Sequence, residues 1–107
     1  KCNLTGSDFT KSQLQNCNFD HVVARDTIFY KSDLTGSSFR YANLIQATLE
    51  KANLAGCDFT GATLFRTNVS KVKLSAETKF DGAFRDQLEV YPIHRDQLNV
   101  NALFTNE

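Results

Sequence analysis

The sequence predicts a solenoid, a fold in which one short structural unit stacks on the next and contacts only its neighbours. Three observations predict it. Large apolar residues recur every five positions, a second pattern repeats every 20 residues, and both patterns end after Leu74. The 107-residue chain is short enough for one compact unit, with a repetitive part followed by a different C-terminal part.

The five-residue register places Leu or Phe at thirteen of its fifteen central positions. Two positions before each centre stands Ala, Ser, Thr, Cys or Val. A helix repeats every 3.6 residues and a strand every two, so neither produces this spacing. The chain must therefore turn a corner once per repeat, with one large and one small residue pointing inward on each side. The central positions are Leu4, Phe9, Leu14, Phe19, Ala24, Phe29, Leu34, Phe39, Leu44, Leu49, Leu54, Phe59, Leu64, Val69 and Leu74.

The 20-residue period indicates how many sides make one turn. Four five-residue sides per turn would stack like on like, giving internal ladders of Phe and Leu and an external ladder of Lys. Glycine often stands two residues after a centre, at a corner where its freedom to take a positive φ is useful. The series with this period are Phe19, Phe39 and Phe59; Leu14, Leu34, Leu54 and Leu74; and Lys11, Lys31, Lys51 and Lys71.

These repeats resemble the pentapeptide repeat family, whose consensus is A(D/N)LXX. The best local matches are Ala42-Asn43-Leu44-Ile45-Gln46, Ala52-Asn53-Leu54-Ala55-Gly56 and Cys57-Asp58-Phe59-Thr60-Gly61. The resemblance covers residues 1–76 and implies that family's fold, an all-β solenoid known as the right-handed quadrilateral β-helix. The repeats would make about four coils, a rod on the order of 18 Å long at the spacing of paired strands.

One repeat within this region is expected to be weak. Its centre is Ala24 where the other repeats have a larger residue, which predicts a local cavity or an inward shift of the chain. The register then fails at position 79, which is Lys. One inserted residue would return Phe80 to the Phe ladder, with Thr78 as its small inward partner.

Residues 77–107 are expected to form a C-terminal capping segment that hides the interior of the last coil. Over residues 81–106 we expect mostly helix, because Phe84 and Leu88 are four positions apart and suit one side of a helix. Strand or extended structure for part of this segment is the alternative, since Leu and Val also alternate there.

Composition and motifs exclude several classes of function. Twelve Lys and Arg balance twelve Asp and Glu, whereas a nucleic-acid-binding protein normally carries a basic excess. No apolar run approaches the roughly 18 residues of a membrane span. No catalytic motif, phosphate-binding loop or metal-ligand spacing stands out. We therefore expect no enzyme activity, no cofactor and no metal.

The cysteines and histidines have structural interpretations. Cys2, Cys17 and Cys57 all fall on the small inward position and predict buried free thiols that act as small hydrophobes. Cys17 and Cys57 would lie two coils apart, roughly 9.6 Å, which is beyond disulfide reach. His21 and His94 are isolated, one at a corner and one in the cap, and are expected to be solvated or structural.

Two sets of outward side chains are candidate sites. The Lys ladder would attract phosphate or carboxylate groups, although solvated corner lysines are the plainer interpretation. Outward apolar and aromatic residues are typical of contact surfaces, unless the C-terminal segment covers them within the molecule. The Lys ladder consists of Lys11, Lys31, Lys51 and Lys71, and the candidate partner surface consists of Val23, Ile28, Tyr30, Tyr41, Ile45 and Phe65.

We expect a non-enzymatic protein–protein interaction or scaffold module, with a homodimer as one form of association. The resemblance also implies an alternative, a DNA-mimicking protein that binds a topoisomerase such as gyrase. Members of that branch are long and acidic, whereas this chain is neutral and carries the Lys ladder. No Met precedes Lys1, so we expect a processed chain or a piece of a longer protein. Free cysteines favour the cytoplasm, with a secreted chain as the alternative.

Overall fold

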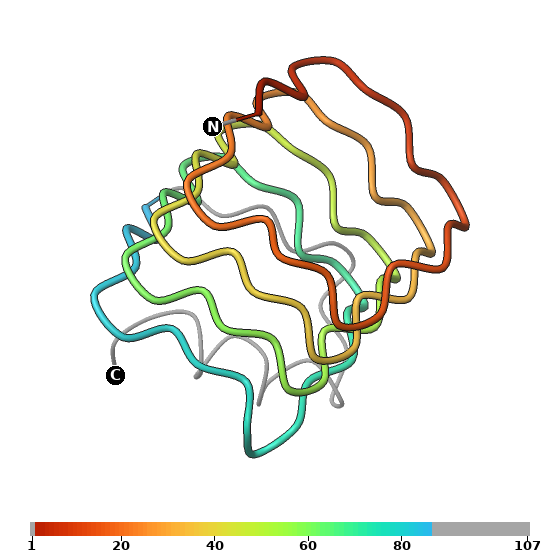
Figure 1. Cartoon of the computed structure of the whole chain (residues 1–107), viewed down its shortest axis with the longest axis vertical. Helices are drawn as coiled ribbons and strands as arrows, with labels where there is room; N and C mark the ends of the chain where they lie inside the picture. The colour runs from red at the N-terminus through yellow and green to blue at the C-terminus, as the bar shows by residue number, and fades with distance from the viewer. Residues whose placement is uncertain (1, 87–107) are drawn as a thin grey trace.

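The computed structural model describes residues 2–86; residues 1 and 87–107 lie outside the described part. Within residues 2–86 the backbone forms no helix and no strand longer than one paired residue. Pairing consists of single parallel bridges, and successive turns of the chain lie side by side (Figure 1). Asn3 pairs with Val23 and Val23 with Asn43, a separation of 20 residues that holds up to the bridge between Asn53 and Lys73. This is the spacing that the sequence predicts.

Each turn has four faces, which we number by the residues at their centres. A bridging residue points outward, and the central residue after it points inward. Central residues from Ala24 to Val69 are at most 1% exposed, whereas those of the first turn are half-buried. Face 1 contains Leu4, Ala24, Leu44 and Leu64; face 2 contains Phe9, Phe29, Leu49 and Val69; face 3 contains Leu14, Leu34, Leu54 and Leu74; and face 4 contains Phe19, Phe39, Phe59 and Phe80.

Stacked phenylalanine rings form the centre of face 4. The centroids of Phe19 and Phe39 are 4.8 Å apart, and Phe59 lies 5.2 Å from both Phe39 and Phe80. Phe29 of face 2 meets Phe19 and Phe39 edge-on at 6.0 and 5.7 Å. Stacked and edge-on pairs each add about 0.5–1.5 kcal/mol beyond the burial of area. The rings therefore join adjacent turns and also opposite faces.

The repeat predicted to be weak keeps its place in this core. Ala24 is fully buried, and its main-chain N–H donates to the carbonyl of Asn43 at 2.8 Å. Its hydrogen bonding is thus that of its neighbours. The cavity or inward shift at Ala24 stays a prediction.

Buried hydroxyl groups two positions before the centres need acceptors, because an unpaired buried polar group is costly. Thr27 Oγ1 donates to the carbonyl of Leu4 at 2.8 Å, and Thr67 Oγ1 donates to that of Leu44 at 2.8 Å. Both threonines are fully buried. Each acceptor belongs to the preceding turn, so the small polar residues tie turns together as well as fill corners.

The corners take a left-handed backbone conformation with or without glycine. Ten non-glycine residues, all two positions after a centre, have φ between 55° and 63°. Each left-handed residue would cost about 1–2 kcal/mol in isolation. The main-chain N–H of Lys31, one of them, donates to the carbonyl of Glu50 on the next turn at 3.0 Å. Bonds of this kind between turns offset the cost and hold the corner.

One inserted residue before Phe80 shifts the register, but the pairing between turns continues. The next bridge, between Asp58 and Lys79, joins residues 21 apart. Phe80 stacks on Phe59, as predicted. Thr78 is its small partner, also as predicted, and its Oγ1 donates to the carbonyl of Leu54 at 2.9 Å.

Residues 81–86 do not begin the helix that the sequence predicts over 81–106. Asp81 and Gly82 form a turn, and Phe84 bridges to Thr63, its N–H donating to the carbonyl of Ala62 at 2.8 Å. The reason is that the edge of the preceding turn offers partners for this backbone once the inserted residue has restored the register. The remainder of the predicted cap, including His94, lies outside the described residues, and its boundary after residue 76 stays a prediction.

Three outward aspartates bind the threonine two residues later. Asp33 Oδ1 accepts hydrogen bonds from the hydroxyl of Thr35 at 2.6 Å and from its main-chain N–H at 3.1 Å. The hydroxyl bond, followed by the N–H bond, holds the pKa of Asp33 below its ordinary value because both stabilise the carboxylate. The other pairs are Asp8 with Thr10 and Asp58 with Thr60.

Phe39→Ala should destabilise the protein more than Phe9→Ala. Phe39 is fully buried between two stacked rings, whereas Phe9 is half-buried and stacks on Phe29 at 5.4 Å. We expect Phe39→Ala to lower the free energy of unfolding by about 3–5 kcal/mol and Phe9→Ala to lower it clearly less, measured by urea titration. Equal losses would contradict a core centred on the middle turns.

Thr35→Val should change the pH dependence of stability. The folded pKa of Asp33 lies below the ordinary value of 3.8, so its carboxylate contributes stability above that pH and loses the contribution as pH falls through the folded pKa. The difference in unfolding free energy between the wild type and Thr35→Val should be constant near neutral pH and shrink in acid. Thr63→Val, on face 1, serves as the control. A difference that persists unchanged in acid would assign the effect to packing instead.

Candidate functional site

Four of the six candidate partner-surface residues lie on or beside face 1. Val23 is an outward residue of this face. Ile45 and Phe65 stand at the corner between faces 1 and 2 on adjacent turns, joined through the hydrogen bond from Gln46 N to Phe65 O at 3.0 Å. Tyr41 stands at the other corner of the same face, between faces 4 and 1. The structure therefore brings these four residues to one side of the molecule.

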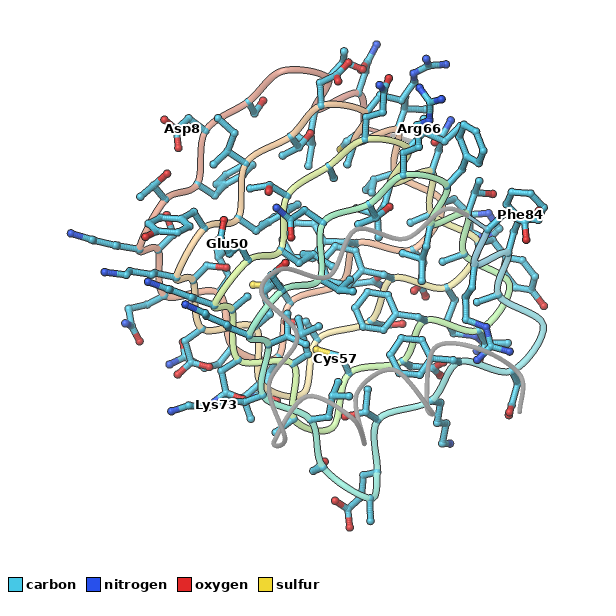
Figure 2. All side chains as sticks on the ribbon, turned by 180° about the vertical axis from the view of Figure 1, so that it is seen from behind. Asp8, Glu50, Cys57, Arg66, Lys73 and Phe84 are labelled. Carbon is cyan, nitrogen blue, oxygen red and sulfur yellow. The ribbon has the colours of Figure 1, made fainter. Side chains whose placement is uncertain are left out.

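Phe84 joins this side, although sequence reasoning assigned it to the cap. It occupies the outward position of face 1 and is 48% exposed. Its ring centroid lies 6.1 Å from that of Phe65. Figure 2 shows Phe84 and Arg66 on the side of the molecule away from Glu50 and Lys73. The return of Phe80 to the Phe ladder was the available signal, since it places residue 84 outward.

Arginine side chains lie over the aromatic rings at both corners of face 1. The guanidinium carbon of Arg66 is 5.4 Å from the centroid of Phe65, and that of Arg40 is 5.9 Å from the centroid of Tyr41. Arg40 Nε also lies 4.0 Å from Asp58 Oδ2. Cation–π contacts at exposed sites contribute about 0.5–1 kcal/mol each. They orient the rings and keep a positive charge beside the apolar surface.

A stacked column supports Tyr41 at its corner. His21, which the sequence also places at a corner, stacks on the Tyr41 ring with centroids 5.3 Å apart. On the next turn the ring lies over Gly61, where an added Cβ would come within 2.5 Å of Tyr41 Cδ1 and Cε1. Glycine at position 61 thus leaves room for the ring, and Tyr41 remains 54% exposed.

The Lys ladder lies at the corner between faces 2 and 3, apart from face 1. Its four residues all have left-handed φ values, from 56° to 61°. Tyr30 stands at the same corner, with Lys31 Nζ 5.4 Å and Lys51 Nζ 5.8 Å from its ring centroid. Ile28 lies on face 2, between this corner and face 1. Tyr30 therefore stands at a different corner from Phe65, and Ile28 lies on the face between the two corners.

A family model described as "Pentapeptide repeat region" matches residues 1–80. The chain belongs to the pentapeptide repeat family. The right-handed quadrilateral β-helix is the fold of this family, and the bridges between residues 20 apart match its register. The number of coils stays a prediction, as does a helical cap beyond residue 86.

Two solved pentapeptide repeat proteins support this fold. One, from the thylakoid lumen of Arabidopsis thaliana, is 27% identical over 96% of this chain and 76% of its own, with a TM-score of 0.56. The other, Rfr23 from the cyanobacterium Cyanothece 51142, is 30% identical over 74% of this chain, with a TM-score of 0.65. The match covers 57% of the Rfr23 chain, little more than half.

A third solved structure is more distant in sequence. Trypsin-treated QnrB1, a plasmid-mediated fluoroquinolone resistance protein, is 10% identical over 83% of this chain and 65% of its own, with a TM-score of 0.49. A search of curated protein sequences gives no match.

The cysteines of these pentapeptide repeats are free, as predicted, but differ in burial. Cys57 is buried with its Sγ 2.9 Å from the carbonyl of Leu34, and burial raises the pKa of its thiol to about 12. Cys17 is only half-buried, so the predicted burial is confirmed for Cys57 alone. Cys2 is exposed because it lies on the first described turn, so the prediction that it is buried is wrong. The Cys57 thiol is protonated at neutral pH and is no nucleophile.

Residues 2–86 hold no group of three His, Cys, Asp or Glu side chains placed to bind a metal ion. In the same part of the chain, no helix has the length and apolar character to cross a membrane.

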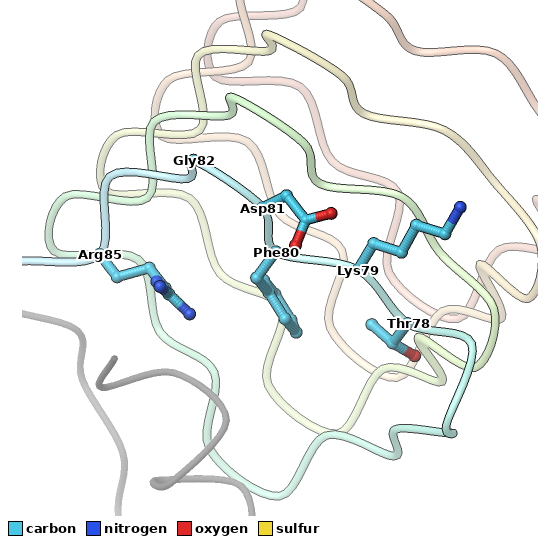
Figure 3. A pocket seen from close by; sticks show the side chains of 6 residues that line it. All are labelled: Thr78, Lys79, Phe80, Asp81, Gly82 and Arg85. Carbon is cyan, nitrogen blue, oxygen red and sulfur yellow. The ribbon is translucent and has the colours of Figure 1, made fainter. Parts of the chain in front are cut away.

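An open pocket of about 390 Å³ lies beside the last described turn. Phe80 and Arg85 point into it (Figure 3). Arg85 follows the outward Phe84 and so takes the position where earlier turns of face 1 have Leu or Ala. The apolar column of face 1 therefore ends at this guanidinium. The lining residues are Thr78, Lys79, Phe80, Asp81, Gly82 and Arg85.

Gly61→Ala should destabilise the protein more than Gly6→Ala. Both glycines have left-handed φ values, 68° and 74°, so both substitutions carry a backbone cost of about 1–2 kcal/mol. At Gly61 the new Cβ also meets the Tyr41 ring, whereas at Gly6 nothing lies within 4 Å. The extra loss should disappear when Gly61→Ala is made in a Tyr41→Ala background, measured by thermal unfolding. An extra loss that remains would show that the ring is not its cause.

Proposed function

We propose that this pentapeptide repeat protein is a non-enzymatic interaction module that associates with a second copy of itself through face 1. The face 1 surface consists of Val23, Tyr41, Ile45, Phe65 and Phe84. One observation carries the proposal. Within residues 2–86 the large apolar side chains that are exposed are Tyr41 and Phe84, at 54% and 48%, and both border this face.

The composition of the face 1 surface supports a contact role. Aromatic residues and arginine dominate the energetics of protein interfaces, and here Arg66 lies over Phe65 and Arg40 over Tyr41. The rings stand on a backbone that is hydrogen-bonded from turn to turn, so little conformational freedom is lost on association. Such a pre-ordered surface suits a scaffold module.

The order of charges along the corner between faces 1 and 2 favours a second copy as the occupant. Arg25 stands one turn before Ile45, and Asp86 stands one turn after Phe65. A twofold axis presents the same surface to itself in reverse order. With the axis between Ile45 and Phe65, each Ile45 would face the partner's Phe65 and each Arg25 would face the partner's Asp86. Apolar groups would then meet at the centre and opposite charges at the rim.

The alternative of a DNA-mimicking topoisomerase-binding protein requires a predominantly acidic surface. Residues 2–86 carry ten Lys and Arg against nine Asp and Glu. The charge of the described part therefore favours the interaction module. Inhibition of gyrase supercoiling by the purified chain would reverse this preference.

Phe65→Asp should dissociate the dimer, whereas Ala55→Asp should not. Both substitutions place a carboxylate directly after a face centre, but Ala55 lies at the diagonally opposite corner, between faces 3 and 4. We expect the dissociation constant, measured by light scattering over a wide concentration range, to rise at least about 30-fold for Phe65→Asp. Circular dichroism should show both variants folded.

A charge exchange tests the twofold arrangement itself. Arg25→Asp should weaken the dimer, and Arg25→Asp/Asp86→Arg should restore it, because the rim pair is re-formed with its signs reversed. A wild type that is monomeric at every concentration would overturn the proposal. So would unfolding of Phe65→Asp alone, because residues within the same chain would then cover face 1.

A further inference from the structure

Positive charge is concentrated at the corner that carries the Lys ladder. This corner holds four of the ten Lys and Arg side chains in residues 2–86 but only one of the nine carboxylates, Glu50. The remaining described residues carry six cations and eight carboxylates. The described part of the molecule is therefore polarised, with its positive pole at the Lys ladder. This pole lies on the side away from Phe84, as the positions of Glu50 and Lys73 in Figure 2 show.

The ladder is straight and partly ordered. Parallel bridges align successive turns, so its residues follow one another at about the 4.8 Å spacing of paired strands. Tyr30 holds two of the ammonium groups, with Lys31 Nζ and Lys51 Nζ at 5.4 and 5.8 Å from its ring centroid. The result is a narrow row of charge along one edge of the solenoid.

The corner is built for an extended anionic surface rather than for a small anion. A corner is convex, so its side chains diverge. The main-chain N–H groups of Lys11, Lys31 and Lys51 already donate to carbonyls of the next turn at 2.8–3.0 Å. These main-chain donors are already used, so an anion at this corner meets the diverging ammonium groups of the side chains. Attraction of this kind grows with the number of charges that lie opposite the row.

We propose that the Lys ladder, with Tyr30, binds the surface of a lipid bilayer that contains anionic lipids, reversibly and without insertion. Lysine clusters are attracted to anionic headgroups, and tyrosine is enriched at the membrane interface. A straight edge meets a plane along its whole length. The net negative remainder of the described residues turns this edge, rather than another, towards the plane.

Other polyanions fit the corner less well. Single-stranded nucleic acid is held by bases stacking on aromatic rings, and here two ammonium groups lie over the Tyr30 ring. A protein partner requires buried apolar anchors. Apart from Ile28, the outward residues beside the ladder are polar or charged: Asp8, Thr48 and Asn68 on face 2, and Gln13, Asp33, Asn53 and Lys73 on face 3.

The test is co-sedimentation of the full chain with phosphatidylcholine vesicles that contain or lack phosphatidylserine, at low and high salt. Binding should require phosphatidylserine and decline with salt. Lys51→Gln should lower the partition coefficient about fivefold. Lys31→Gln/Lys51→Gln should lower it further, by a factor that departs from the product of the single effects because both ammonium groups lie over Tyr30. Glutamine suits these positions because Gln46 already has a φ of 59° at an equivalent corner. The matched control is Lys79→Gln, which removes one charge from face 4 and should change binding less than about twofold.

Three results would overturn the proposal. They are no binding to phosphatidylserine vesicles at low salt, an equal loss for Lys79→Gln, and binding to polyglutamate without binding to vesicles. The last would assign the ladder to an acidic polypeptide. Phe65→Asp should still bind phosphatidylserine vesicles, because it leaves all four lysines of the ladder in place. Vesicle binding by that variant separates this proposal from self-association.

Discussion

Main-chain hydrogen bonds between successive turns determine where the side chains of residues 2–86 point. Outward residues up to Asn53 pair with the residue 20 positions later, as Asp33 does with Asn53, so inward residues align with inward residues. The stacked rings, the buried hydroxyl bonds and the left-handed corners all depend on that alignment. Where one residue is added, before Thr78, the corner absorbs it and Lys79 resumes the pairing with Asp58. Pairing between turns therefore continues to Phe84, although the five-residue sequence pattern ends after Leu74.

The same alignment produces the surfaces. A residue type repeated every 20 positions becomes a column on one edge, whether it is Lys in the ladder or the apolar pair Ile45 and Phe65. Columns bring side chains of like character to about 5 Å from one another, a spacing at which rings stack favourably and like charges repel. Tyr30 reduces that repulsion by lying against two ammonium groups. At the opposite side, Gly61 leaves room for the ring of Tyr41.

Residue positions predict which side chains point outward, but not which of them lie together. Val23, Tyr41, Ile45 and Phe65 were recognised as outward apolar residues because they break the polar pattern of their positions. Tyr30 and Ile28 were grouped with them, yet they lie at another corner and on another face. The four-residue spacing of Phe84 and Leu88 predicts a helix, yet Phe84 continues the register of the turns and its exposed ring contacts Phe65. Which outward residues share a surface depends on which columns of stacked residues are neighbours, and only the folded turns show this.

The sequence by itself determined the five-residue turn, the 20-residue period and the identity of the inward residues. Those features are local. A small residue followed two positions later by a large one can be recognised on each side without knowing which turn packs against it. Only the tertiary structure decided that pairing continues through Phe84, that Cys2 is exposed while Cys57 is buried, and that the Tyr41 ring lies over Gly61. Each of these depends on the neighbouring turn. Ala62 supplies the carbonyl that accepts from Phe84, preceding turns cover Cys57 but not Cys2, and Gly61 leaves space for the Tyr41 ring. That information is distributed over residues 20 positions apart.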